Sequence, residues 1–256
     1  MTFDLSRRSD IAIAILSPLA LIALWQVGVV SGFFDDRFVP APIGIVGTFV
    51  EMIGSGELFE HIGISLMRVA IGFSAGVGAG VLVGLTMGIF RPVRAALTPI
   101  VASLFPVPKL AILPILILFF GIGETSKVLV IAIGVFFISL INTVSGVLNI
   151  DRIYIDVARN LGVSGRAYYW NVAIPGALPS IVASAKLSMG VALLLIVAAE
   201  FVGASSGVGY LIWSSWQNFS LDRMFVGLVT LAGLGYIFTM ALEFLEGRIL
   251  PWRPAR

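Results

Sequence analysis

Cysteine is absent from the 256-residue chain, and histidine occurs once, as His61. A chain without cysteine has no disulfide, no thiol nucleophile and no cysteine-ligated zinc or iron–sulfur site. A single histidine also leaves a histidine-based metal site without its usual ligands. We therefore expect no metal site in this chain, and no side chain stands out as a catalytic residue.

Charge is also scarce, because only 12% of the residues are charged whereas 59% are hydrophobic. Soluble domains carry about 25% charged residues. The sixteen lysines and arginines are spread in ones and twos along the chain, so they form no basic patch of the kind that binds nucleic acid. The composition excludes a soluble domain and a disordered chain, and it predicts a membrane protein with no nucleic-acid partner.

Six stretches are long and apolar enough to cross a membrane, which takes about 20 residues in a helix. They cover residues 11–30, 64–90, 97–120, 127–148, 180–199 and 223–245. The first is longer than a signal-peptide core and lacks a small-residue cleavage site after it, so we expect it to be retained. The sequence predicts an all-α membrane protein with six transmembrane helices in one domain over 1–256. In this domain, spans two to six form a core over about 64–245.

The lysines and arginines near the span ends predict the orientation of the chain. Ten of them lie at the termini and in the second and fourth connections, whereas the other connections hold only Arg37, Lys127 and Arg223. The ten are Arg7, Arg8, Arg91, Arg94, Arg152, Arg159, Arg166, Arg248, Arg253 and Arg256. We therefore expect both termini to be cytoplasmic.

Glycine recurs at every fourth position of the second span. The five residues are Gly72, Gly76, Gly80, Gly84 and Gly88. Small residues at this spacing form one helix face on which another helix can pack closely. The partner is either a helix of the same chain or a helix of another subunit.

Prolines cluster in and before the third span, where Pro106, Pro108 and Pro114 surround Lys109. Each proline removes a backbone donor and clashes with the preceding turn, so we expect this span to be kinked or broken. Lys109 either lines a translocation path or extends its ammonium group to the membrane surface. Three more charged side chains lie near membrane depth and are candidates for the path or for an interface: Arg68, Lys186 and Glu200.

The connection over residues 149–179 contains an amphipathic pattern too short to span a membrane. Ile150, Ile153, Val157 and Leu161 recur at helical spacing, and Gly162 supplies a stop. Ser164 can cap a second helix. We expect this helix–glycine–helix element to lie on the cytoplasmic face of the membrane, where it either docks another protein or has no partner.

At this connection the sequence resembles the permease subunits of binding-protein-dependent ABC importers, whose signature reads E-A-A, three residues, G, and then an I-x-L-P run. Asp156, Val157, Ala158 and Gly162 occupy the first places, with Asp for Glu and Val for Ala, and the run IPGALP over 174–179 occupies the last. Further segments are similar to the nitrate, sulfonate and taurine branch: PAPIGIVGTF from Pro40, SGELFEHIGISLMRVAIGF from Ser55, PVPKLAILPILILFFGIGETSK from Pro106 and AAEFVGASSGVGYLI from Ala198.

The resemblance implies the type I importer (MetI-like) permease fold in a bacterial inner membrane. It also implies a second permease copy, two cytoplasmic ATPase subunits that hold ATP and magnesium, and a periplasmic or lipid-anchored solute-binding protein. The short helix would enter the ATPase as a coupling helix, through a loop formed by Asp156, Val157, Ala158, Arg159, Gly162, Ile174, Leu178 and Pro179. Similar permeases handle nitrate, sulfonates, taurine, aromatic anions or neutral pyrimidine precursors, so the solute stays open.

The chain lacks an ATP-binding loop of its own, because none of its three lysines follows a glycine. We therefore expect a transport subunit with no bound cofactor rather than an enzyme, surrounded by membrane lipid. The alternative is a secondary active transporter, which also needs broken helices but shows internal repeats that we do not find here. An intramembrane hydrolase that uses Lys186 with Ser184 or Ser188 is disfavoured, because residues two apart on a helix point to different faces.

Overall fold

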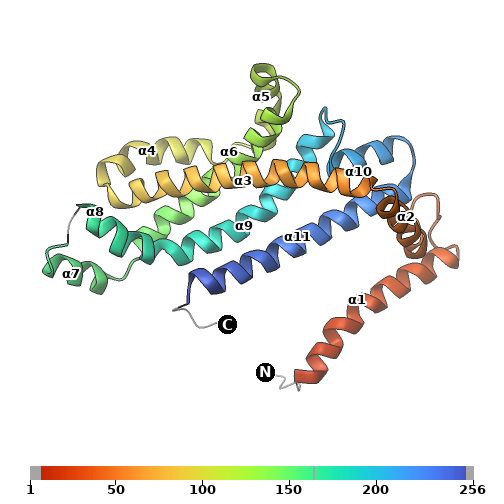
Figure 1. Cartoon of the computed structure of the whole chain (residues 1–256), viewed down its shortest axis with the longest axis horizontal. Coiled ribbons are helices and arrows are strands. Elements are labelled where there is room, and N and C mark those ends of the chain that lie inside the picture. The colour runs from red at the N-terminus through yellow and green to blue at the C-terminus, as the bar shows by residue number, and fades with distance from the viewer. Residues whose placement is uncertain (1–6, 164, 252–256) are drawn as a thin grey trace. The chain divides into compact units, whose positions relative to one another are not determined.

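The computed structural model describes residues 7–163 and 165–251, and within these ranges every regular element is a helix (Figure 1). Five single helices or continuous helical stretches are long and apolar enough to cross a membrane. They are α1 (Arg7–Val30), α3 (Glu57–Ile89), α6 (Glu124–Leu148), the stretch Gly165–Phe201 and α11 (Leu221–Ile249). The prediction of a multi-span helical protein is therefore confirmed.

The third predicted span is broken, as the prolines indicated. It consists of α4 (Arg91–Leu104), a short 3-10 turn η1 (Lys109–Ile112) and α5 (Leu113–Phe120), and its two halves meet at 89°. Pro106 and Pro108 lie in the gap between the halves. In Figure 1, α5 turns away from α4. The predicted total of six spans is reached when this bent pair counts as one.

Two shorter helices were not predicted, α2 (Pro42–Gly54) and α10 (Val208–Gln217). Both are too short to span a membrane as a single helix. Neither came out of a search for runs of about 20 apolar residues, because such a search finds only complete spans.

The first compact unit consists of Met1–Glu60 and Leu211–Thr230, and its described part contains α1, α2 and the adjoining portions of α10 and α11. The Ile43 N–H at the start of α2 donates to the side-chain oxygen of Gln26 on α1 at 3.1 Å. The ring centroids of Trp25 and Phe225 are 5.6 Å apart. These contacts connect α1 to α2 and to α11 inside the unit. The expectation of a single domain over 1–256 stays a prediction.

The second compact unit consists of His61–Tyr210 and Leu231–Arg256, and α3, α6 and α9 (Ile174–Phe201) form its core. The five-glycine face of α3 packs on α6. A β-carbon added to Gly76 or Gly80 would lie 2.5 Å from the carbonyl oxygen of Ala132 or Phe136. Corresponding close contacts to α6 occur at Gly72, Gly84 and Gly88. Of the two partners considered for this face, the structure places a helix of the same chain against it.

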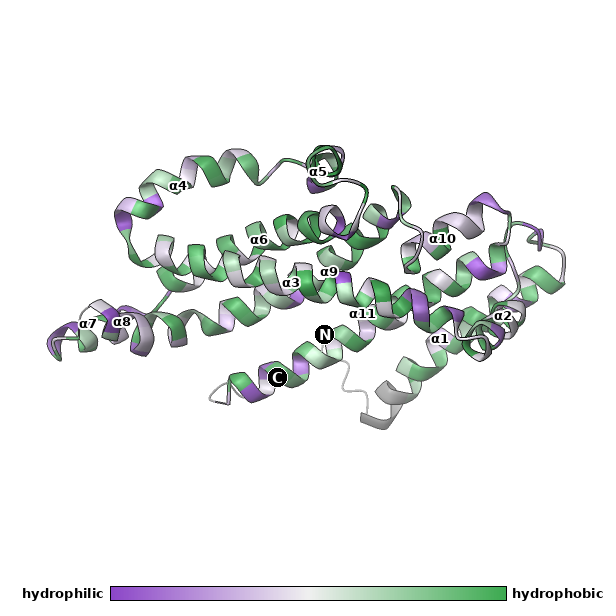
Figure 2. Cartoon of the chain, turned by 45° about the horizontal axis from the view of Figure 1, so that its top comes forward, coloured by the Kyte–Doolittle hydropathy of each residue, from purple (hydrophilic) through white to green (hydrophobic). Residues whose placement is uncertain are grey.

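The helix that contains the fifth predicted span begins well before residue 180. Helix α8 (Gly165–Tyr168) continues through a π-helical turn (Tyr169–Ala173) directly into α9, so the second half of the predicted connection 149–179 is helical. Pro175 does not interrupt it, and this proline lies just after the π-helical turn, at the second residue of α9. Ser164, expected to cap the second helix, lies outside the described residues. Hydrophilic residues gather on α7 (Arg152–Asn160) and α8 (Figure 2), whereas α5 consists of apolar residues.

Candidate functional site

A buried cluster of charged side chains lies where α3, α6 and α9 meet. Arg68 on α3 is 2% exposed and donates to two carboxylates. Its Nε and Nη2 atoms contact the two oxygens of Glu124 at 2.5 and 2.6 Å, and its Nη1 contacts Glu200 at 2.7 Å. Such a two-bond contact between guanidinium and carboxylate is strong and directional. Arg68 therefore connects three helices of the second unit through its ion pairs.

Glu200 is fully buried and accepts from several donors besides Arg68. The Ser65 hydroxyl donates to one of its oxygens and the Gly209 N–H donates to the other, both at 2.7 Å. The Val208 N–H in turn donates to Ser65 at 2.8 Å. These two N–H groups belong to the first turn of α10 (Val208–Gln217), and the N–H groups of a first turn have no acceptor within the helix. A buried carboxylate and a hydroxyl thus satisfy the start of that helix.

The exposure of the two carboxylates differs, since Glu124 is 52% exposed whereas Glu200 is buried. Glu124 is the first residue of α6 and follows Gly123. Lys127, one turn later, is buried and donates to the Gly123 carbonyl at 3.2 Å. Near the same end of α3, His61 accepts at Nδ1 from the Gly207 N–H at 3.1 Å. The cluster is neutral when Arg68 and Lys127 are counted against the two glutamates.

Arg68 and Glu200 were candidates for a translocation path or a membrane interface. The structure places both inside the second unit, paired with each other rather than on an open surface. Ser65 and Glu124, which complete the cluster, were missed. Glu124 carries no spacing signal, because it joins Arg68 from another helix, and Ser65, three residues before Arg68 on α3, is an ordinary small polar residue until its contact with Glu200 is known.

Lys109 caps the first half of the broken span. Its ammonium group donates to the carbonyl oxygens of Leu104, Phe105 and Val107 at 2.9, 2.7 and 2.7 Å. It also lies 4.6 Å from the centroid of the Phe137 ring on α6, a distance typical of a cation–π contact. The carbonyls at the end of α4 lack partners within the helix, so Lys109 stabilises the bend by supplying donors.

Lys186 on α9 forms an ion pair with Glu246 on α11 at 2.5 Å. Neither serine considered as its partner is bonded to it, because Ser184 donates to the carbonyl of Ile181 and Ser188 is buried elsewhere on the helix. The geometry therefore does not assemble the serine–lysine pair of a hydrolase. Among the described residues, no group of three or more His, Asp or Glu side chains could hold a metal ion.

Helix α7 exposes apolar side chains although it lies outside the predicted spans. Asp151 caps its start by accepting from the Ile153 N–H at 3.0 Å, and Gly162 ends it with a φ of 69°. Ile153 is 66% and Leu161 75% exposed, whereas Ala158 is only 5% exposed and faces inward. The predicted helix and its glycine stop are confirmed, and most of the predicted apolar stripe faces outward.

The remaining residues of the predicted coupling loop divide between two environments. Val157 is exposed, and Asp156 and Arg159 are exposed and lie 4.0 Å apart on α7. Ile174, Leu178 and Pro179 are half-buried in the first turns of α9. Ile174 packs on a small core of Leu85, Val147, Ile150 and Ala177, so this half of the loop contributes to the second unit itself.

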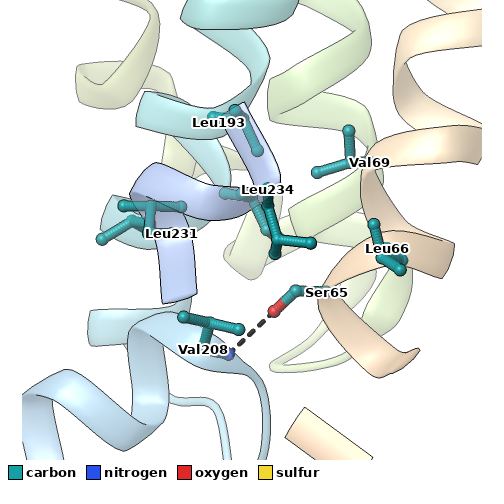
Figure 3. Close-up of a pocket in the computed structure, with 9 residues that line it drawn as sticks. Ser65, Leu66, Val69, Leu193, Val208, Leu231 and Leu234 are labelled. Carbon is teal, nitrogen blue, oxygen red and sulfur yellow. Dashed lines mark hydrogen bonds between the residues drawn. The ribbon is translucent and has the colours of Figure 1, made fainter. Parts of the chain in front are cut away.

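A small cavity in the second unit has Ser65 of the charged cluster among its lining residues, and Figure 3 shows this lining. Leucines and valines of α3, α9 and α11 line it, and the Ser65–Val208 hydrogen bond forms one edge. Its volume of about 10 Å³ is no more than one water molecule needs. This cavity is therefore too small to hold a transported solute.

Comparison with known proteins assigns the chain to a family. Residues 76–251 match the model of the binding-protein-dependent transport system inner membrane component. The chain is 40% identical to the aliphatic sulfonates transport permease protein SsuC of Bacillus subtilis, over 93% of this chain and 87% of that one. It is 31% identical to the taurine transport system permease protein TauC of Escherichia coli, over 98% and 92% of the two chains. It is 30% identical to the nitrate import permease protein NrtB of Synechocystis, over 95% and 89%.

The fold agrees with this assignment. A chain of the MetNI methionine ABC transporter, solved in inward-facing conformations, superimposes with a TM-score of 0.61 over 75% of this chain and 94% of that one, at 20% identity. The relatives are transport permeases rather than enzymes, and nothing in the comparisons supports a secondary active transporter. The chain therefore belongs to the inner membrane components of binding-protein-dependent transport systems, as a multi-pass permease subunit of the ABC importer type.

Proposed function

We propose that two copies of this chain form the membrane path of an importer for a small anionic solute, an aliphatic sulfonate, taurine or nitrate. Two cytoplasmic ATPase subunits would bind ATP and magnesium and dock on α7, and a solute-binding protein would deliver the solute at the opposite side. The names of the relatives support the solute class, because three of them transport sulfonates, taurine or nitrate.

The exposed apolar residues of α7 are the observation that carries this proposal. Ile153 and Val157 on α7 and Leu161 directly after it are more than half exposed, and the helix also carries Asp156 and Arg159. Exposed apolar groups on a short helix outside the membrane are typical of a surface that another protein covers. On this proposal α7 lies in the cytoplasm, together with both termini, as the distribution of arginines predicts.

The small internal cavity supports a path between two copies, because it leaves no room for a solute at that point of the chain. Most side chains of α1 over Ala12–Val30 are exposed, which suits contact with membrane lipid.

The test is ATP hydrolysis and solute uptake by the permease reconstituted with its ATPase and its binding protein. We expect Leu161→Glu and Val157→Glu to abolish binding-protein-stimulated hydrolysis and uptake together, because both place a charge on the exposed face of α7. A matched control, Phe219→Glu, places the same charge on an exposed apolar residue between α10 and α11, on the opposite side of the membrane from α7 in the proposed orientation, and should leave the ATPase subunits bound.

Ala158→Glu is less informative than these variants, because Ala158 is buried and the added charge would disturb the second unit itself. Normal transport by both α7 variants, or failure of any ATPase to bind the wild-type chain, would contradict the proposed docking role.

A further inference from the structure

We infer that the Nε–Nη2 edge of Arg68 is a binding site for the oxyanion of the solute, which the Glu124 carboxylate occupies in the structure described here. The inference rests on the proposed function for the solute class, and it adds the residues that would recognise the anion. It follows from four features of the cluster: the contact geometry, the unequal exposure of the two carboxylates, the fixed position of the arginine and the charge left when Glu124 moves away.

The contact between Arg68 and Glu124 has the geometry with which a guanidinium group binds an oxyanion. Two parallel N–H groups, Nε and Nη2, meet two oxygens of one carboxylate at 2.5 and 2.6 Å. Nitrate and sulfonate groups also present two oxygens at a similar separation, so they fit the same edge. A lysine ammonium at this position would not offer that paired geometry.

The two carboxylates that contact Arg68 differ in how freely they can leave. Glu200 is buried and held by three donors, Ser65, Arg68 and Gly209. Glu124 is half exposed, and Arg68 is the side chain that holds it. It also begins a helix that no side chain caps, directly after Gly123 and near Gly121, whose φ is 80°. Glu124 is therefore the carboxylate that an incoming anion can replace.

Arg68 stays in place when Glu124 moves. Its Nη1 remains bonded to Glu200 at 2.7 Å and to the Ser206 carbonyl at 2.8 Å. The free edge then faces the opening that the Glu124 side chain leaves. A preorganised donor pair loses little conformational entropy when it binds a ligand, which favours binding.

The charge of the cluster changes in the direction that an anion requires. With Glu124 in place, Arg68 and Lys127 balance Glu124 and Glu200, and the sum is zero. Without the Glu124 carboxylate the same groups sum to +1. A solute anion restores neutrality in Glu124's place, so the exchange leaves no uncompensated charge in a partly buried site. On the proposed orientation, this edge lies at the outer ends of α3 and α6, the side at which a binding protein would deliver the solute.

The test is the affinity of the permease–ATPase complex in nanodiscs, without the binding protein, for radiolabelled ethanesulfonate. We expect Glu124→Gln to strengthen ethanesulfonate binding about tenfold, because the neutral amide binds the Arg68 edge more weakly than the carboxylate and is displaced more easily. Glu57→Gln is the matched control, since Glu57 also forms a half-exposed ion pair with an arginine, Arg223, and should leave the affinity unchanged. Diethyl sulfone, an uncharged analogue, should compete no better in Glu124→Gln than in wild type.

A second variant tests the geometry of the site. Arg68→Lys in the Glu124→Gln background keeps the positive charge but loses the paired donors, and it should remove the tenfold gain. Equal affinity of wild type and Glu124→Gln would overturn the inference, as would a full gain in the double variant. If the wild-type complex couples ATP hydrolysis to uptake while these affinities fail to change, the anion site is wrong and the proposed function stands. If the wild-type chain binds no ATPase, the proposed function itself fails.

Discussion

The two ends of the helices α3, α6 and α9 place charged and apolar residues in opposite ways. At the Arg68 end, charged groups are buried and paired, whereas beyond the other end apolar side chains of α7 are exposed. Arg68 and Leu85, which marks the core next to α7, are 17 residues apart on α3, or about 25 Å along the helix. The comparison shows that the charged groups at one end find their partners within the chain, while apolar side chains beyond the other end stay exposed.

Removing one partner of the buried Arg68–Glu200 ion pair should lower the stability of the protein most. We expect Glu200→Ala to lower the free energy of unfolding by about 3–5 kcal/mol, because it leaves Arg68 without its fully buried partner. Glu57→Ala removes a carboxylate from the half-exposed pair with Arg223 and should cost about 1 kcal/mol or less. Unfolding of purified protein in mixed micelles, followed by circular dichroism, measures both. Similar losses for the two variants would show that burial of the Arg68–Glu200 pair does not matter.

For the broken span we expect an intermediate loss of stability, because Lys109 holds it through hydrogen bonds to backbone carbonyls rather than through a buried ion pair. We expect Lys109→Met to cost about 1.5–3 kcal/mol and to change the angle between α4 and α5, since three carbonyls lose a charged donor. Spin labels on cysteines introduced at Ala96 and Leu118 report the distance between the two halves, and the chain has no native cysteine to interfere.

If Lys109 instead lines a path without shaping the span, Lys109→Met will lower uptake while the spin-label distance and the stability stay as in wild type. That result would favour the path interpretation of the sequence over the capping contact in the structure.

Substitutions of the glycines of α3 should lower stability only on the side of the helix that packs on α6. We expect Gly76→Val to cost about 1–3 kcal/mol, because its β-carbon would lie 2.5 Å from the Ala132 carbonyl oxygen and force α3 away from α6. Gly78→Val on the same helix has no atom within 4 Å of the new β-carbon and should be close to neutral. Thermal unfolding of the two variants in detergent gives the difference, and a larger loss for Gly78→Val would place the packed face elsewhere.

Much of the fold was predictable because the bilayer imposes simple rules on sequence. Long apolar runs located the membrane-spanning helices, and the prolines around Lys109 located the break in the third span. Gly162 marked the end of α7 because a positive φ there favours glycine. The helical turns before residue 180 were missed, since Pro175 and Pro179 were taken as boundaries although the helical stretch from Gly165 continues through both prolines.

The site was harder to predict, because its members meet only through tertiary packing. Sequence reasoning found Arg68 and Glu200 as charges near membrane depth, yet it could not show that they pair with each other or that Glu124 completes the cluster. It also counted Ala158 among the docking residues, although this side chain faces inward. Periodicity defines the faces of a helix, but it does not say which neighbour each face meets.

The uninterrupted helix from Gly165 to Phe201 has a mechanical consequence. It starts three residues after the glycine that ends α7 and contains Glu200, so one continuous helical stretch connects the region next to α7 with the buried cluster. A helical stretch of 37 residues is about 55 Å long, and it is stiffer than a loop. A displacement of one end is therefore transmitted to the other end. Within this stretch, the π-helical turn Tyr169–Ala173 is the place where the backbone hydrogen bonds depart from the regular α-helical pattern, and we expect the helix to bend there.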